Sequence, residues 1–261
     1  MAGKSEAKIS TALVEELTPQ IPIKTKNGNL RLYCPGRLPI YRAETFFTKE
    51  PETLEWIDDF EENAVFWDIG ANIGIYSLYA GLKKRIEVLA FEPAAPNFYL
   101  LNRNIEINQL ENKITSFGIA FNDVTQLDHF FMSNTEIGSA LHSFSKATDW
   151  KGQSFSPKFK QGMIGFTIDE FIKRFDPKFP TYIKIDVDGI EKQIVEGAVE
   201  TLNDIRLKSI LVELDESQPE ISNTVISILE NAGLKLCSKQ HSALFDNTEY
   251  SSVYNHIFRR S

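Results

Sequence analysis

The sequence predicts an α/β fold: a doubly wound, mostly parallel sheet of seven strands with helices on both faces. Three observations lead to this prediction. Apolar runs with strand character alternate with helical patterns from residue 51 to residue 261. A glycine-rich turn connects the first of these strands to a helix. The last two runs, Leu234 to Cys237 and Val253 to Arg259, have no helical pattern between them, so the final strand is predicted to run antiparallel.

The glycine-rich turn lies within residues 64–82. Ala64 to Trp67 is a short apolar run rich in β-formers and predicts a buried strand. The next residues, Asp68 to Gly74, read DIGANIG, and glycine and asparagine tolerate the left-handed backbone of a tight turn. Apolar residues then recur at helical spacing as far as Leu82. This order predicts a nucleotide-binding site, because small residues let a ligand approach the backbone closely.

The spacing of the turn favours S-adenosylmethionine (SAM) over NAD. A dinucleotide-binding turn has the pattern G-x-G-x-x-G, whereas this one offers Gly70 and Gly74 with Asn72 between them. Asp68 suits a ligand that carries a cationic or amino group better than a pyrophosphate. Glu92 ends the second predicted strand, where a carboxylate accepts hydrogen bonds from both hydroxyls of a ribose. The antiparallel final strand is a further difference from a NAD-binding fold.

The composition of the chain limits the kinds of partner that the protein is expected to bind. The 261 residues are 42% apolar, enough for a sizeable core, and their formal charge of −8 argues against nucleic acid as the main partner. No run is long enough to span a bilayer, and the N-terminus has no signal-peptide pattern. Two cysteines, Cys34 and Cys237, favour a reduced, cytoplasmic chain, with a single disulfide as the alternative.

Residues 1–50 are predicted to form an N-terminal extension to a catalytic domain of residues 51–261. Ile9, Leu13 and Leu17 suggest a short helix, and Asn27-Gly28 is typical of a hairpin turn. Pro51 suits the first turn of the helix that leads to the glycine-rich segment. We expect the extension to pack against the core or to close over the substrate, without chemistry of its own.

The middle of the chain is predicted to be irregular. A third strand is expected from Ile114 to Phe121, and because no acidic side chain ends it, Ile119 and Ala120 would meet adenine through their backbone. A short strand is expected from Leu127 to Met132. Residues 133–162 form a polar stretch that predicts a long loop, and loops of this length in compact domains are often functional.

Strand character resumes at Gly162 to Phe166, and Thr167 is placed to cap a helix from Ile168 to Phe175. Two further buried strands, Tyr182 to Val187 and Ser209 to Glu213, each precede a helical pattern. Acidic residues follow both strands at the edge where such sheets bind ligands.

Three blocks of the sequence resemble the FkbM family of SAM-dependent methyltransferases. They are FTKEPETLEWIDDF leading into FWDIGANIGIYSLYAG; LAFEPAAPNFYLLNRNIEIN; and TIDEFIKRF followed by YIKIDVDGIEKQIVEGA. The last block carries the most specific pattern, K-I-D-V-[DE]-G-x-E before a helix and a Gly-Ala. The resemblance extends from Phe46 to Arg259 and implies the Rossmann-like fold of class I methyltransferases.

The resemblance also implies site residues. Asp68, Gly70, Asn72 and Gly74 would surround the methionine part of SAM, and Glu92 would hold its ribose. Family members generally methylate hydroxyl oxygens of sugars or of small metabolites, so a glycan or small-molecule acceptor is expected. The predicted cofactor-binding residues are Asp68, Gly70, Ala71, Asn72, Gly74, Glu92, Pro93, Ile119, Ala120 and Asp186.

A hydroxyl acceptor calls for a base that removes its proton. The candidates are His142 in the long loop and three carboxylates at strand ends, Asp186, Asp188 and Glu213. We predict Asp186 and His142 as catalytic, the alternative for His142 being a surface residue without a role. We predict no metal, although Asp186, Asp188, Glu191, Glu213 and Asp215 could together offer oxygen ligands to Mg²⁺.

Two other functions remain open at this point: a SAM-binding module without turnover, and a NAD-linked oxidoreductase. The lysines of the long loop could receive an anionic acceptor or could be solvated; they are Lys146, Lys151, Lys158 and Lys160.

Overall fold

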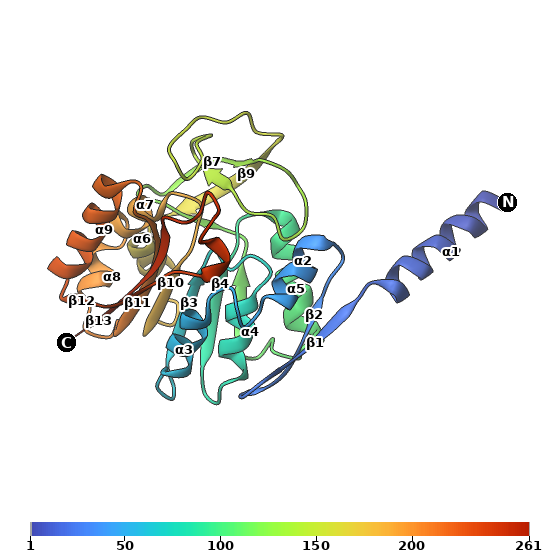
Figure 1. Ribbon diagram of the computed structural model, residues 1–261, viewed down its shortest axis with the longest axis horizontal. Coiled ribbons are helices and arrows are strands. Elements are labelled where there is room, and N and C mark those ends of the chain that lie inside the picture. The colour runs from blue at the N-terminus through green and yellow to red at the C-terminus, as the bar shows by residue number, and fades with distance from the viewer. Residues whose placement is uncertain (1, 261) are drawn as a thin grey trace.

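The computed structural model describes residues 2–260 and has a seven-stranded sheet at its centre (Figure 1). The strands are β3 (Val65–Ile69), β4 (Glu87–Phe91), β5 (Ile114–Phe117), β10 (Tyr182–Ile185), β11 (Ser209–Asp215), β12 (Leu234–Gln240) and β13 (Val253–Arg260). Their order is β12-β13-β11-β10-β3-β4-β5. Strand β13 runs antiparallel to β11 and β12, and the remaining pairs are parallel. The predicted sheet, including its antiparallel last strand, is confirmed.

Helices cover both faces of this sheet (Figure 1). One face carries α3 (Pro51–Asp58), α4 (Ile75–Leu82) and α5 (Ala95–Ile107); the other carries α6 (Ile168–Phe175), α7 (Glu191–Glu196), α8 (Val199–Asn203) and α9 (Pro219–Asn231). Thr167 caps α6 as predicted, since its hydroxyl accepts a hydrogen bond from Glu170 N over 3.0 Å. Phe171 of α6 packs edge-on against Trp67 of β3 and Phe91 of β4, which joins this helix to the sheet.

The N-terminal region contains α1 (Ala2–Leu17), β1 (Gln20–Thr25), β2 (Gly28–Tyr33) and α2 (Arg37–Glu44). The hairpin predicted at Asn27-Gly28 is confirmed, with Ile23 opposite Leu30. Helix α1 is longer than the short helix expected and projects away from the other elements (Figure 1). Helix α2 was not predicted. Pro39 falls in its first turn, where proline's missing N–H breaks no helical hydrogen bond.

A second sheet of four strands, in the order β6-β9-β7-β8, corrects two predictions. Its strands are β6 (Ala120–Phe121), β7 (Gln126–Met132), β8 (His142–Phe144) and β9 (Phe159–Phe166). The expected strand from Ile114 to Phe121 is interrupted after Phe117, and its end pairs with β9 instead. The expected loop of residues 133–162 contains β8 and the start of β9, which both pair antiparallel with β7, the strand directly before this segment.

Both cysteines are free: Cys34 is buried and Cys237 is exposed, so no disulfide joins them. Among the described helices, none combines the length and the apolar character that a membrane crossing requires.

Candidate functional site

A cavity of about 510 Å³ lies at the carboxyl ends of the parallel strands. Gly70 after β3, Glu92 after β4, Asp186 after β10 and Glu213 in β11 all contribute to its lining. Ligands in open α/β sheets bind at this edge, because the strand order reverses here and leaves a crevice. The four residues are distant in sequence, and the sheet brings them to one cavity as predicted.

Gly70 and Asn72 of the glycine-rich turn line this cavity. Gly70 has a φ of +86°, and a Cβ atom there would lie 1.9 Å from the carbonyl oxygen of Asp186, so only glycine fits. The amides of Gly70 and Ala71 both donate to the carbonyl of Phe91 over 3.0 Å. Asn72 takes the left-handed conformation expected for it, with a φ of +50°. These bonds fix the backbone close to the cavity.

Glu92 is buried and faces the turn. Its Oε2 accepts a hydrogen bond from Asn72 N, and its Oε1 accepts one from Ala94 N, each over 2.8 Å. Burial raises the pKa of Glu92 to about 7, although these two bonds favour the ionised form. A carboxylate oriented by two amides keeps lone pairs for further donors, as a ribose would supply.

The remaining predicted cofactor residues divide into two groups. Pro93, Ile119 and Ala120 line the cavity, together with Phe91 and Phe121, and form an apolar end of it beyond β4. Asp68, Ala71 and Gly74 are not among its lining residues. Asp68 is buried in β3, where it accepts a hydrogen bond from Ser77 Oγ over 2.5 Å. A Cβ atom on Gly74 would meet Leu101, so this glycine serves the packing of α4 on α5.

Arg42, from the unpredicted helix α2, also lines the cavity. Its Nε and Nη2 donate to the carbonyl of Gly138 over 3.2 and 2.9 Å. The next carbonyl, that of Ser139, accepts from Asn72 Nδ2 over 3.0 Å and from Asn97 Nδ2 over 2.9 Å. The N-terminal region and the glycine-rich turn therefore hold the same segment of the chain over the cavity, which the sequence did not reveal.

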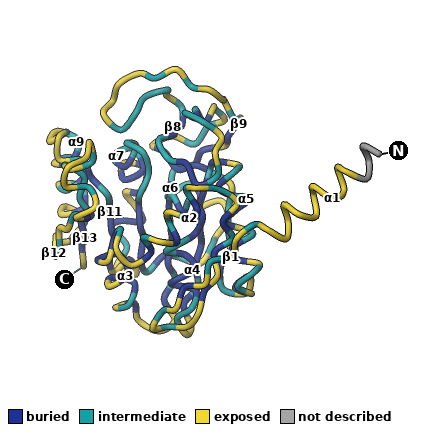
Figure 2. The backbone as a smooth tube through the Cα atoms, turned by 45° about the vertical axis from the view of Figure 1, so that its right-hand side comes forward, coloured by how far each residue is buried: buried dark blue, intermediate teal, exposed yellow. Residues whose placement is uncertain are grey.

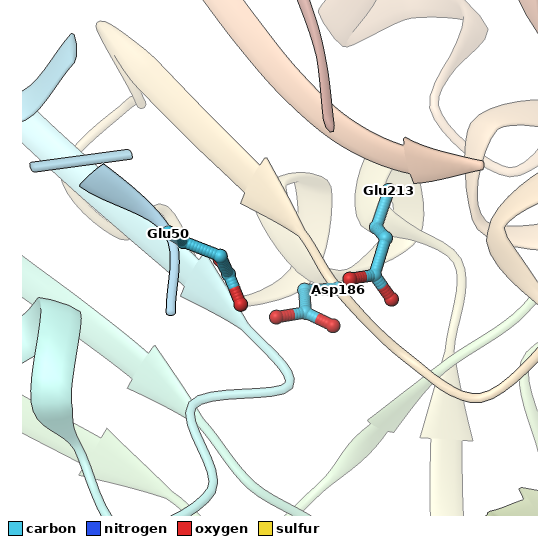
Figure 3. A group of neighbouring side chains, drawn as sticks. All are labelled: Glu50, Asp186 and Glu213. Carbon is cyan, nitrogen blue, oxygen red and sulfur yellow. The ribbon is translucent and has the colours of Figure 1, made fainter. Parts of the chain in front are cut away.

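Carboxylates and lysines cluster beside the cavity. One carboxylate oxygen each from Glu50, Asp186 and Glu213 lies within 4.8 Å of the other two (Figure 3). Lys184 is fully buried in β10; it forms an ion pair with Asp186 and lies 3.9 Å from Glu50. Lys49 forms an ion pair with Glu50 over 2.5 Å. Two lysine ammonium groups thus already balance two of the three carboxylates, so the cluster is an ion-pair network in its own right.

This network shifts the pKa values of its members in opposite directions. Burial alone would raise the pKa of Glu50, but Lys49 and Lys184 outweigh it and hold this pKa well below its usual range. Burial, with Asp186 and Glu50 nearby, raises the pKa of Glu213 well above that of an ordinary glutamate. Lys184 stands between apolar residues in the sequence YIKID, and a charge inside a buried strand was the available signal of this network.

His142 lies in β8, buried, and lines the cavity, so it is not the surface histidine considered as its alternative. Its Nδ1 accepts a hydrogen bond from Ser133 N over 3.3 Å, which places the proton of the neutral ring on Nε2. Burial lowers its pKa to about 4. Asp188 accepts a hydrogen bond from His142 N over 2.9 Å, and burial raises the pKa of this aspartate to about 6.

None of the four lysines of the 133–162 segment lines the cavity.

Residues 68–236 match the family model of the methyltransferase FkbM domain. The chain belongs to the FkbM methyltransferase family. A methyltransferase of Beauveria bassiana is 25% identical to it, over 67% of this chain and 73% of that protein. A hexuronic acid methyltransferase of Haloferax volcanii, AglP, is 23% identical over 60% of this chain and 59% of its own length. A proposed rRNA methylase of Clostridium thermocellum shares the fold, with a TM-score of 0.50 at 8% identity, over 82% of this chain and 97% of that one.

Membership in the FkbM family makes this chain a SAM-dependent methyltransferase with a Rossmann-like class I fold. The residues present fit the cofactor. Gly70 has no side chain and lines the cavity through its backbone, and Glu92 is already oriented by two amides. The Oδ1 atom of Asn72 is buried without a hydrogen-bond partner in the described part of the chain, so a donor from a ligand would satisfy it.

Proposed function

We propose that this FkbM methyltransferase methylates a hydroxyl oxygen of a sugar, a polysaccharide precursor or a small metabolite. The observation that carries the proposal is the position of Glu213. It lines the cavity beside Asp186, and no hydrogen bond engages its carboxylate among residues 2–260. A hydroxyl has a high pKa, and a free carboxylate with a raised pKa is suited to accept its proton.

The two residues predicted to be catalytic, Asp186 and His142, take different roles in this proposal. Asp186 is held by Lys184 and would orient the cofactor and the acceptor at the end of β10 rather than remove a proton. His142 carries its proton on Nε2, so it would donate a hydrogen bond to a bound ligand. When bound, SAM supplies a methyl group that is already electrophilic because it is attached to a sulfonium. The main task of the protein is then to hold the acceptor oxygen in line with the bond between the sulfur and the methyl group.

The side chains that line the cavity support a sugar or a similar ring as acceptor. Strand β11 lies on the opposite side of β10 from β3 and β4, so the cavity has an end remote from Glu92. Phe245 and Tyr250 line this region together with Lys49 and Glu213. Aromatic side chains contact the apolar faces of a sugar ring, and charged groups bind its hydroxyls. The likeness to a hexuronic acid methyltransferase agrees with such an acceptor. A cytoplasmic location is part of the proposal, in keeping with the two free thiols.

Transfer of label from methyl-tritiated SAM to a panel of acceptors tests the proposal. The panel holds free and nucleotide-activated hexoses, hexuronic acids, amines and small phenols, and binding of SAM and NAD is measured by calorimetry. We expect SAM to bind, NAD not to bind, and label to appear in an alkali-stable methyl ether. Label in an alkali-labile ester or in an amine would contradict hydroxyl methylation. SAM binding without transfer to any acceptor would favour a module without turnover.

Glu213→Gln should lower kcat by about 100-fold and leave SAM affinity unchanged, because it removes the base but keeps the shape. Since the raised pKa of Glu213 keeps it protonated at low pH, wild-type kcat should rise as the pH rises, and the variant should lose this rise. Asp215→Asn is the matched control: Asp215 lies in the same strand and bonds to Ser217 outside the cavity. Equal loss of activity in both variants would refute the role of Glu213.

A further inference from the structure

A second, smaller cavity of about 30 Å³ adjoins the first at the glycine-rich turn. Gly70, Asn72, Arg42, Lys49 and Asp186 line both cavities, and Tyr76 lines only the smaller one. One wall is therefore the backbone of the turn, and the opposite wall comes from the N-terminal region. The role of this cavity follows from its charges.

The larger cavity is rich in acidic side chains, since Glu92, Asp186, Asp188 and Glu213 all line it. The methionine part of SAM carries a sulfonium and an α-amino group, which such a cavity attracts, but also an α-carboxylate, which it repels. A cation is needed where that carboxylate lies. Of the described residues that line the two cavities, Arg42 and Lys49 are the ones with a cationic side chain.

Lys49 is already engaged, because it forms an ion pair with the buried Glu50. Arg42 bonds only to the carbonyl of Gly138, a neutral acceptor, through Nε and Nη2. No carboxylate lies within ion-pair distance of it in residues 2–260, and its Nη1 has no hydrogen-bond partner there. Arg42 is thus a half-buried guanidinium with unused donors, positioned by the Gly138 carbonyl and facing the glycine-rich turn.

We propose that Arg42 binds the α-carboxylate of SAM. With the ribose at Glu92 and the adenine beyond it at Ile119 and Ala120, the methionine end of the cofactor extends over Gly70 toward the smaller cavity. The guanidinium supplies a charge-assisted hydrogen bond there, stronger than one between neutral groups. The helix α2 is then part of the cofactor site. This inference depends on SAM binding and not on the identity of the acceptor.

Calorimetric titration with two ligands tests the inference: SAM, and decarboxylated SAM, which lacks only the α-carboxylate. We expect Arg42→Met to weaken SAM binding by at least about tenfold and to change the affinity for decarboxylated SAM by less than about twofold. Arg42→Lys should keep part of the preference for SAM, because it retains the charge. Arg37→Met is the matched control: Arg37 is exposed on the same helix and lines neither cavity, so both affinities should stay unchanged.

Three outcomes would overturn the inference. If Arg42→Met weakens the binding of SAM and of decarboxylated SAM equally, Arg42 acts by holding the segment at Gly138 instead. If it weakens the binding of neither ligand, the guanidinium is free to bind an anionic acceptor. If Arg42→Lys has no preference for SAM over decarboxylated SAM, the charge at this position does not recognise the carboxylate. Failure of the wild type to bind SAM would instead contradict the cofactor assignment itself.

Discussion

Glu92 shows how a single buried carboxylate links cofactor binding to pH. Two backbone amides orient it, yet burial raises its pKa to about 7, so near neutral pH it is only partly ionised before a ligand arrives. Ribose hydroxyls are hydrogen-bond donors and are best bound by the ionised form. Asp188 raises and Arg42 lowers the pKa of Glu92. The charged groups around the cavity therefore set the pH at which Glu92 is ionised and able to bind ribose.

The affinity for SAM should therefore fall as the pH drops below about 7. Below that pH the free protein holds a proton on Glu92 that binding must release, so the affinity should decrease by up to about tenfold per pH unit. Calorimetry between about pH 7.5 and about pH 5.5 measures this slope.

Glu92→Gln is the control for this slope. It should bind SAM more weakly at pH 7.5 and show a smaller slope, the remainder reflecting Asp188, whose pKa is raised to about 6. An identical slope in the wild type and the variant would show that Glu92 does not control the pH dependence.

Among the secondary-structure elements, those whose signals are local could be predicted from the sequence. The turn after β3, the cap of α6 and the hairpin of β1 and β2 each depend on a few adjacent residues. The four-stranded sheet could not be predicted in this way, because β6 consists of two residues whose partners in β9 lie more than forty residues away along the chain. The roles of Arg42, Lys49 and Glu50 were missed for the same reason: nothing in the local sequence shows that residues before α3 return to the ends of β10 and β11.

The junction between the turn after β3 and the end of β10 should not tolerate a methyl group. In Gly70→Ala, the added Cβ would lie 1.9 Å from the backbone oxygen of Asp186 at a φ of +86°. Because backbone must move, we expect unfolding to become easier by about 3 kcal/mol or more. Thermal denaturation should show a Tm lower by at least about 6 °C, together with weaker SAM binding.

Gly162→Ala in β9 is the matched substitution. A Cβ atom at Gly162 would meet nothing within 4 Å, so its Tm should stay close to that of the wild type. If Gly70→Ala were as stable as Gly162→Ala, β3 and β10 would not be packed as tightly as the structure indicates.

At the scale of the whole molecule, the N-terminal region consists of two parts that differ in their attachment. All described side chains of α1, residues 6–17, are exposed, and the helix projects from the molecule (Figure 2). The hairpin, in contrast, buries Ile23, Leu30 and Leu32 against the core. It is also bonded to α5, since Asn104 Oδ1 accepts from Tyr33 N over 2.9 Å. We therefore propose that the structural boundary lies near residue 18, rather than near residue 50, where the sequence suggested it.

Two truncations distinguish these boundaries. Removal of residues 1–17 should change neither Tm nor SAM affinity, because it uncovers no buried surface in the described part of the chain. Removal of residues 1–36 should lower the free energy of unfolding by about 3 kcal/mol or more, since each buried aliphatic side chain of the hairpin contributes about 1.5 to 3 kcal/mol. It should also weaken SAM binding, because α2 loses the hairpin that precedes it and Arg42 loses its fixed position. If the chain without residues 1–36 kept both its Tm and its SAM affinity, the hairpin would neither stabilise the core nor hold α2 in place. The proposed role of Arg42 would then have to be independent of the packing of the hairpin against α2.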